Sequence, residues 1–146
     1  MQVVRPAVAS DADSVFGLLT LLAMSYQPSR AAFDRTYPLL IASPSAHLLV
    51  AEDEEGIAGY VYACDMPTLF ANGTITEILE LYVVESRRRR GIGARLVNAV
   101  VERARERGAV EVTVPTRRAS VFYEAIGFES TAELLKLRLT ASEGRP

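Results

Sequence analysis

The run Arg88-Arg89-Arg90-Gly91-Ile92-Gly93 is the part of the sequence whose residue types best suit chemistry. It lies between a run of strand-forming residues and an amphipathic run, so its glycines fall where the backbone turns into a helix. The first N–H groups of a helix are unpaired and carry partial positive charge, which suits a phosphate. Glycine also lets a phosphate approach the backbone closely. The loop therefore predicts a site for an anion such as a pyrophosphate.

Two common nucleotide motifs do not match this loop. A mononucleotide loop requires Gly-x-x-x-x-Gly-Lys followed by Ser or Thr, and a dinucleotide fingerprint requires a third glycine. A solvated basic turn and a nucleic-acid or localisation patch are the other interpretations of the arginines at 87–90. The spacing favours the phosphate of a cofactor over both.

Strands and helices alternate along the chain around this loop. Runs of β-branched, aromatic and alternating apolar residues predict strands at 2–5, 47–52, 57–64, 74–84, 110–114 and 134–139. Helical patterns cover 10–24, 29–41, 91–107 and 119–125. We predict an α/β fold with a mixed, largely antiparallel central sheet flanked by helices.

Local signals support several of these boundaries. Ser10 and Asp13 resemble a capping box, and Ser29 can cap the second helix. In the third helix the apolar residues Ile92, Leu96, Val100 and Ala104 follow the helical period, and Gly108 ends it. The acidic turn at 53–56 joins two strands, and we interpret its carboxylates as solvated. Residues 142–146 are expected to fray.

Two motifs in order resemble the GNAT N-acetyltransferase family. Arg88, Gly91 and Gly93 match its Gln/Arg-x-x-Gly-x-Gly/Ala signature. The stretch Ala119-x-x-Phe122-Tyr123-x-x-Ile126-Gly127-Phe128 is similar to the family's helix that ends in Tyr-x-x-hydrophobic-Gly-Phe. The resemblance spans about residues 3–139. It implies a GNAT-like acyl-CoA N-acyltransferase fold and a single domain over 1–146, with a short tail at 140–146.

The resemblance implies acetyl-CoA as the acetyl-donating co-substrate, without a metal. In the family the preceding strand pairs with the pantetheine arm and the loop holds the pyrophosphate. The positions that would contact the cofactor are Leu81, Tyr82, Val83, Arg88, Arg89, Arg90, Gly91, Ile92, Gly93, Ala94 and Thr116. Thr116 departs from the family, which frequently has asparagine there, so its contact would come from a hydroxyl. Which arginines reach the adenosine 3′-phosphate is left open.

Tyr123 is by resemblance the acid that protonates the departing CoA thiolate. A phenol of pKa about 10 can donate to a sulfur group of similar basicity. The alternative role for Tyr123 is aromatic packing against Phe122 and Ile126.

The acceptor amine must lose its ammonium proton before it attacks. Glu80, Glu77 or a water chain would remove that proton, and we rank Glu80 slightly above Glu77. Their separation of three residues predicts opposite faces of a regular strand. Either could instead pair with an arginine. We expect direct attack on the acetyl carbonyl, with strand backbone donors polarising its oxygen. Cys64 is an alternative nucleophile only in principle.

Composition excludes several function classes. The 146 residues fit one domain, and 49% hydrophobic with 23% charged residues is typical of a soluble globular protein. No apolar run approaches the roughly 20 residues of a membrane span. One cysteine permits no internal disulfide, and His47 and Cys64 are too few ligands for a zinc site. A net charge of −2 argues against wrapping nucleic acid. The N-terminal sequence lacks a secretory pattern, which predicts the cytoplasm.

The acceptor is not specified by the sequence. We expect residues 24–41 and 65–73 to shape its pocket, and a small molecule or a protein could carry the amine. A homodimer is expected from the resemblance alone. A non-catalytic acyl-CoA-binding sensor is the alternative function, since it would keep the glycine loop without needing Tyr123, and a nucleic-acid adaptor using the arginines is a third.

Overall fold

A computed structural model describes residues 2–23, 26–116 and 119–140. The strands are β1 (Val3–Pro6), β2 (Ala46–Asp53), β3 (Gly56–Pro67), β4 (Thr74–Val83) and β5 (Glu111–Thr113). The helices are α1 (Ala12–Leu22), α2 (Arg30–Ala42), α3 (Ile92–Glu106) and α4 (Ser120–Ala125), with short 3-10 turns η1 (Ala9–Asp11) and η2 (Glu85–Arg87). The described residues form one sheet in the order β1-β2-β3-β4-β5. Its first four strands are antiparallel and β5 is parallel to β4. The predicted mixed, largely antiparallel fold is confirmed.

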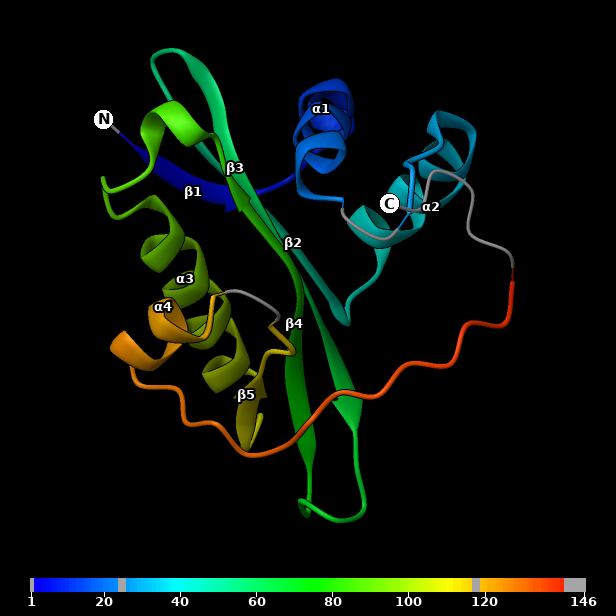
Figure 1. The fold of residues 1–146 in the computed structure, drawn as a ribbon, viewed down its shortest axis with the longest axis vertical. Helices are drawn as coiled ribbons and strands as arrows, with labels where there is room; N and C mark the ends of the chain where they lie inside the picture. Colours follow the sequence, from blue (N-terminus) through cyan, green and yellow to red (C-terminus); the bar gives the residue numbers. More distant parts are fainter. Residues whose placement is uncertain (1, 24–25, 117–118, 141–146) are drawn as a thin grey trace.

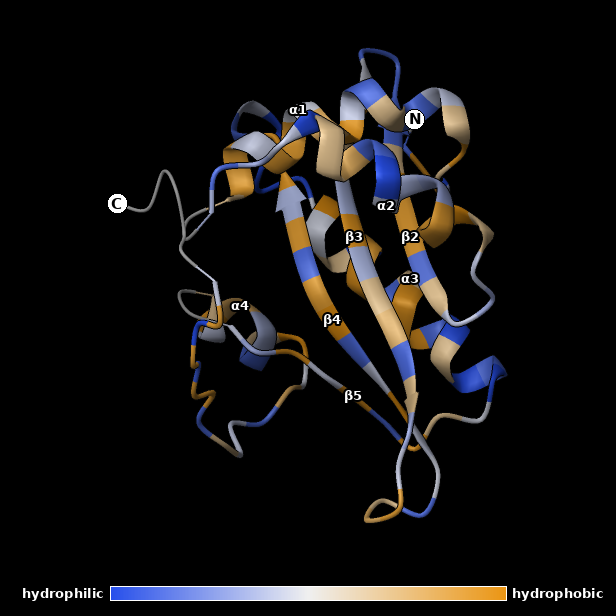
Figure 2. Cartoon of the chain, turned by 90° about the vertical axis from the view of Figure 1, so that its right-hand side faces the viewer, coloured by the Kyte–Doolittle hydropathy of each residue, from blue (hydrophilic) through white to orange (hydrophobic). Residues whose placement is uncertain are grey.

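The sheet separates two helical layers. Helices α1 and α2 cover one face, and α3 covers the other with α4 beside it (Figure 1). Each face has its own apolar cluster. Apolar stretches of β2, β3 and β4 run through the middle of the molecule (Figure 2). In α3 the four residues that the helical period marked, Ile92, Leu96, Val100 and Ala104, are all buried. The prediction that these residues form the buried face of α3 is thus confirmed.

The N-cap residue of α1 is Asp11 rather than Ser10, and its side chain bonds residues before the helix instead of the helix's first N–H groups. Asp11 accepts the N–H of Val8 at 2.9 Å, and its two carboxylate oxygens accept Arg5 at 2.8 and 3.0 Å. Arg5 thereby lowers the pKa of Asp11. The capping box predicted at Ser10 is therefore wrong. In α2 the predicted cap is confirmed, because Ser29 Oγ accepts the N–H of Ala32 at 3.2 Å. Met24, the predicted end of the first helix, lies outside the described residues.

The predicted strand at 134–139 is not formed. Residues 128–139 have no regular secondary structure, and in Figure 1 the segment after α4 leaves the sheet and runs toward α2. There Lys136 and Arg138 lie over the ring of Tyr26. Alternating leucines indicate a strand only when a neighbouring strand offers hydrogen bonds, and this segment has no such neighbour among the described residues. Its exposed leucines are Leu134, Leu135, Leu137 and Leu139.

A buried polar network connects the sheet to α3. His47 is fully buried, with Nδ1 accepting Arg103 Nε at 3.0 Å and Nε2 donating to Asp65 Oδ1 at 2.7 Å. This tautomer follows because a guanidinium can only donate. The same Asp65 oxygen accepts Thr76 Oγ1 at 2.8 Å, and Arg107 lies 3.5 Å from the other oxygen. Asp65 therefore holds three side chains from three different elements.

Replacing Asp65 with alanine is expected to lower the free energy of unfolding by about 3 kcal/mol, because the change leaves buried donors without an acceptor. Urea denaturation followed by circular dichroism measures the effect. Asp13→Ala is the matched control, since Asp13 pairs with Arg30 at 2.8 Å on an exposed surface. That surface pair is expected to contribute about 0.5 kcal/mol. Equal losses in the two variants would show that the network contributes no more than a surface ion pair.

Candidate active site

A β-bulge in β4 sets the direction of the two candidate bases. Glu80 pairs with Tyr62 of β3, whereas the next pair joins Ile78 to Ala63, so Leu79 is an extra residue. Glu77 pairs with Cys64. Because Tyr62 and Cys64 are two residues apart on β3, Glu77 and Glu80 lie on the same face of the sheet. The prediction that they lie on opposite faces is wrong.

Past the bulge, β4 parts from its neighbour β5. The two strands pair only from Ile75 to Glu77, opposite Glu111 to Thr113. The last residues of β4, Leu81, Tyr82 and Val83, therefore have no strand partner on this side among the described residues. Outward-facing backbone groups along this stretch are available to a ligand, except Val83 O, which accepts Arg88 Nε at 2.9 Å. The three residues that the sequence assigned to the pantetheine arm lie on this open edge.

The glycine loop leads from this edge directly into α3. Gly91 is the N-cap residue, with a left-handed φ of 79° that glycine adopts without strain. The first intrahelical bond runs from Arg95 N to Gly91 O, so the N–H groups of residues 91–94 have no helical acceptor. A Cβ on Gly93 would lie 3.3 Å from the Phe122 ring, so glycine permits α4 to pack here. The side chain of Ile92 is buried, which leaves only its backbone for a ligand.

The four neighbouring arginines have different environments. Arg87 is buried and pairs with Asp53 at 3.4 Å and Glu55 at 2.9 Å. The interpretation of the 53–56 carboxylates as solvated is therefore wrong for Asp53, whose side chain is 10% exposed, whereas the paired Glu55 side chain is 72% exposed. Arg88 donates to Val83 O at 2.9 Å and lies over the Tyr82 ring. Arg89 and Arg90 are exposed and pair with no acid among the described residues. They are the arginines of this run that an incoming anion can reach without breaking a contact.

Tyr123 is held beside the loop by α4. It is 5% exposed, and its ring makes edge contacts with Phe122 and Phe128. Burial raises the pKa of Tyr123 to about 12. The hydroxyl makes no hydrogen bond within the described part of the chain, so it is free to donate to a ligand. Thr116, in the preceding loop, accepts the N–H of Ala119 at 3.0 Å and stabilises the start of α4.

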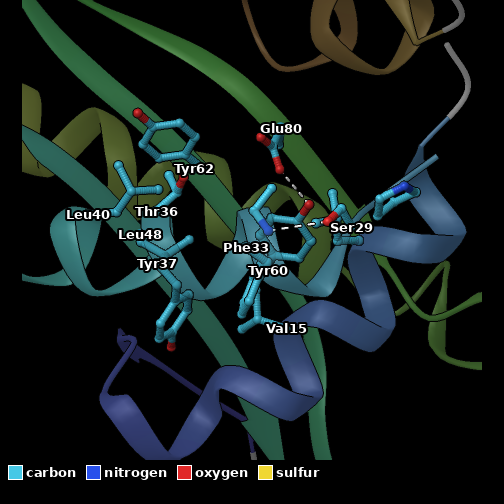
Figure 3. A pocket seen from close by; sticks show the side chains of 13 residues that line it. Val15, Ser29, Phe33, Thr36, Tyr37, Leu40, Leu48, Tyr60, Tyr62 and Glu80 are labelled. Carbon is cyan, nitrogen blue, oxygen red and sulfur yellow. Dashed lines mark hydrogen bonds between the residues drawn. The ribbon is translucent and has the colours of Figure 1, made fainter. Parts of the chain in front are cut away.

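A pocket opens between α1, α2 and the sheet on the face that carries Glu80 (Figure 3). Its volume is about 260 Å³, just below the range of about 300 to 1,000 Å³ that is usual for small-molecule sites. Glu80 lies at this pocket and accepts Tyr60 OH at 2.7 Å, which positions the carboxylate. The lining residues are Val15, Leu19, Pro28, Ser29, Ala32, Phe33, Thr36, Tyr37, Leu40, Leu48, Tyr60, Tyr62 and Glu80.

Glu77 does not line this pocket. Its carboxylate accepts Thr113 Oγ1 at 3.1 Å, next to the last pair of β4 and β5. Cys64 lies opposite Glu77, and its Sγ contacts the carbonyl of Asp65. His47 pairs with Ala63, so it lies on the other face of the sheet and cannot serve Cys64 as a base. Of the two glutamates, only Glu80 lines the pocket.

Of the two segments expected to shape the acceptor pocket, only one contributes to this cavity. Residues 28–40 contribute to its lining as expected, but no residue of the 65–73 turn does. That turn lies at the end of the β3–β4 hairpin, away from α1 and α2 (Figure 1). The aromatic lining of the pocket was not predicted from the sequence. Its signals are Phe33 and Tyr37 four apart on a helix, and Tyr60 and Tyr62 two apart on a strand.

The described residues contain no helix that is long and apolar enough to cross a membrane. Within them, no three His, Cys, Asp or Glu side chains gather as metal ligands would.

Comparison with known proteins gives one family and many similar folds. The model of the GNAT acetyltransferase domain matches residues 44–130, which include the β4 edge, the glycine loop and Tyr123. Human N-acetyltransferase 8 is 36% identical over 90 residues, covering 58% of this chain and 39% of that protein. The chain thus matches about two fifths of that relative's length.

Two solved structures illustrate the similarity of fold. A transcriptional regulator from Bacillus halodurans has a TM-score of 0.86 at 25% identity, covering 95% of this chain and 100% of that chain. The aminoglycoside N-acetyltransferase AAC(6')-Iy in complex with CoA has a TM-score of 0.82 at 17% identity. That comparison covers 97% of this chain and 96% of the other. The architecture thus extends well beyond the residues matched by the family model.

Proposed function

The chain belongs to the GNAT acetyltransferases, whose domain model matches residues 44–130, and on that premise we propose that it transfers acetyl from acetyl-CoA directly to an amine. The observation that carries the proposal is the split between β4 and β5. It leaves an open backbone edge that leads into the unpaired N–H groups at the start of α3. An extended arm ending in a pyrophosphate fits these two features in this order.

The cofactor contacts follow from this arrangement. The edge at 81–83 pairs with the amide groups of the pantetheine arm, and the N–H groups of residues 91–94 bind the pyrophosphate. Arg89 and Arg90 are the arginines for the adenosine 3′-phosphate, because Arg87 is already paired with Asp53 and Glu55. Arg88 contributes by fixing the end of β4 through Val83 O. Thr116 contributes indirectly, because its hydrogen bond to Ala119 stabilises the start of α4, the helix that carries Tyr123.

The chemistry requires two proton transfers. Glu80 accepts a proton from the acceptor ammonium, which frees the nitrogen lone pair to attack the acetyl carbonyl. The new C–N bond forms and the C–S bond breaks, and Tyr123 donates its proton to the departing thiolate. Backbone N–H groups of the open edge polarise the carbonyl oxygen. Transfer is direct, because Cys64 has no base of the histidine type on its face of the sheet.

Binding of acetyl-CoA to the loop is tested by calorimetric titration of wild type, Gly91→Asp and Gly91→Asn. Asp and Asn have the same size, and both tolerate the left-handed backbone at this position. They differ in charge, because only the Asp side chain is negative and would repel the pyrophosphate. We expect Gly91→Asp to weaken binding at least about tenfold relative to Gly91→Asn, since about 1.4 kcal/mol of repulsion suffices.

Two results would contradict this proposal. Equal affinities of the two folded variants would place the pyrophosphate elsewhere, and no binding to wild type would remove the cofactor from the proposal. Binding of acetyl-CoA without transfer to any of a broad set of amines would favour the sensor alternative. Circular dichroism of each variant confirms that the fold is retained.

We also propose that two copies of the chain associate and that the protein is cytoplasmic. The free and partly exposed Cys64 fits a reducing compartment. The leucines of the 134–139 segment support association, because Leu135 is 86% and Leu137 84% exposed. Neighbouring exposed leucines are a common mark of a protein interface.

Light scattering tests the association. We expect the wild type to have twice the chain mass of 15.9 kDa. The Leu135→Glu, Leu137→Glu double variant is expected to be monomeric, because buried carboxylates would be unpaired in the interface. Leu39→Glu, at an exposed leucine of α2, is the matched control and is expected to stay dimeric. A wild type at the monomer mass would refute the dimer.

A further inference from the structure

The pocket beside Glu80 has an unusually apolar, aromatic wall for a site that receives a charged amine. The rings of Phe33 and Tyr37 stack at 5.0 Å between centroids, on the α2 side. Tyr60 and Tyr62 face them from β3, and aliphatic side chains fill the remainder (Figure 3). Tyr37 and Tyr60 are buried, at 4% and 1% exposed, so the rings that a ligand can reach are those of Phe33 and Tyr62. An accessible aromatic surface favours a ring in the ligand.

Most polar groups of the wall are already occupied. Tyr37 OH donates to Val8 O at 2.7 Å, and burial raises the pKa of Tyr37 to about 12. Ser29 Oγ caps α2, and Tyr60 OH donates to Glu80. Among the side chains of the described lining, a ligand therefore finds the carboxylate of Glu80 and the hydroxyls of Thr36 and Tyr62 as its main hydrogen-bonding partners.

The charge of the pocket is equally restricted. Glu80 is the only charged residue of its described lining, which contains no Arg, Lys or His. Arg30 lies over the ring of Phe33 outside this lining, and it is paired with Asp13 and Asp34 at 2.8 Å each. One ammonium thus has a partner in the pocket, whereas a carboxylate, a phosphate or a second ammonium does not.

Resting on the proposed function, we propose that the acceptor is a small arylalkylamine, with one primary ammonium at Glu80 and an aromatic body against the half-buried rings of Phe33 and Tyr62. The volume of about 260 Å³ suits a small ligand better than an oligosaccharide, and the single carboxylate does not match a polyamine. The lack of a basic residue in the lining disfavours amino acids and sugar phosphates. In the transfer step the ammonium gives one proton to Glu80, nitrogen bonds to the acetyl carbon, and the thiolate leaves with a proton from Tyr123.

The test compares 2-phenylethylamine with three amines that change its charge or its ring. 2-Phenylethylamine and phenylalanine share the same body, but phenylalanine adds a carboxylate beside the amine. Ethylamine lacks the ring, and spermidine adds further charges. We expect kcat/KM for 2-phenylethylamine to exceed that for each of the other three at least about 100-fold. Ethylamine loses the burial of a ring, phenylalanine brings a carboxylate without a partner, and spermidine brings ammonium groups without a partner. Mass spectrometry of the acetylated products gives the rates.

A variant at Thr36 tests the charge argument within the pocket. Thr36 lines the pocket but is exposed, so a longer side chain is accommodated without disturbing the core. Thr36→Arg adds the cation that the wall lacks, and Thr36→Gln adds length without charge. We expect Thr36→Arg to raise kcat/KM for phenylalanine at least about tenfold relative to Thr36→Gln, whereas 2-phenylethylamine does not gain.

Separate results overturn the acceptor class and the proposed function. Acetylation of spermidine or phenylalanine at least as efficient as that of 2-phenylethylamine would refute the arylalkylamine class while leaving acetyl transfer intact. Equal rates for ethylamine and 2-phenylethylamine would refute the aromatic body. Failure of the wild type to bind acetyl-CoA in the calorimeter would instead refute the proposed function.

Discussion

Replacing Glu80 with glutamine is expected to lower kcat/KM for amine acetylation about 1000-fold, within the range of a lost general base. Glutamine keeps the size of the side chain, and its amide oxygen can still accept the hydrogen bond from Tyr60 OH that positions Glu80 at 2.7 Å. What is lost is the capacity to take the ammonium proton. Steady-state kinetics with 2-phenylethylamine measures the effect, and calorimetry is expected to give an unchanged affinity for acetyl-CoA.

The pH profile separates proton removal from a role in binding alone. The free amine fraction rises about tenfold per pH unit up to the amine pKa of about 10. The kcat/KM of Glu80→Gln is therefore expected to rise with pH in proportion to the free amine fraction. The difference in kcat/KM between this variant and the wild type then shrinks in alkaline solution. Glu77→Gln is the matched control, because Glu77 lies on the same face but bonds Thr113 outside the pocket. A large loss in Glu77→Gln with none in Glu80→Gln would reverse the assignment.

Much of the framework could be predicted because it depends on short-range patterns. The helical period of α3 follows from four apolar residues, and the turn into it follows from Gly91, whose left-handed φ suits glycine. Ser29 as a cap needs only the adjacent backbone. Such features require no knowledge of distant residues, so the sequence contains enough information to place them.

The bulge at Leu79 shows where local patterns stop being sufficient. Strand periodicity assigns Glu77 and Glu80 to opposite faces, but one extra residue brings them to the same face. A bulge depends on how two strands fit together, and the residue types of β4 alone do not specify it. The same limit applies to Arg87, whose partners Asp53 and Glu55 are more than 30 residues away in the chain.

The strand predicted at 134–139 is wrong for a related reason. Its alternating leucines carry a strand pattern, yet a strand forms only against a partner, and none lies beside it among the described residues of this chain. Likewise, the pocket combines residues of α1, α2, β2, β3 and β4. Its aromatic character appears only when two helices and the sheet are assembled, although each residue is visible in the sequence.

Replacing Tyr123 with phenylalanine is expected to reduce kcat about 1000-fold without changing the affinity for acetyl-CoA. The phenyl ring preserves the edge contacts with Phe122 and Phe128, so the change removes only the hydroxyl. Since burial raises the pKa of Tyr123 to about 12, the hydroxyl keeps its proton at every pH below that value. Loss of the donor is therefore not expected to limit the wild-type rate until pH approaches 12.

Tyr37→Phe is the matched control for Tyr123→Phe, because it also removes a buried tyrosine hydroxyl but one without a proposed part in proton transfer. Burial also raises the pKa of Tyr37 to about 12, but its hydroxyl donates to Val8 O. Tyr37→Phe is expected to lower stability by about 1 kcal/mol and to keep kcat within about threefold of wild type, because its hydroxyl takes no part in proton transfer. Calorimetric unfolding and steady-state kinetics on both variants give the comparison. If Tyr123→Phe retained full kcat, Tyr123 would be a packing residue, and the thiolate would receive its proton from another donor, such as water.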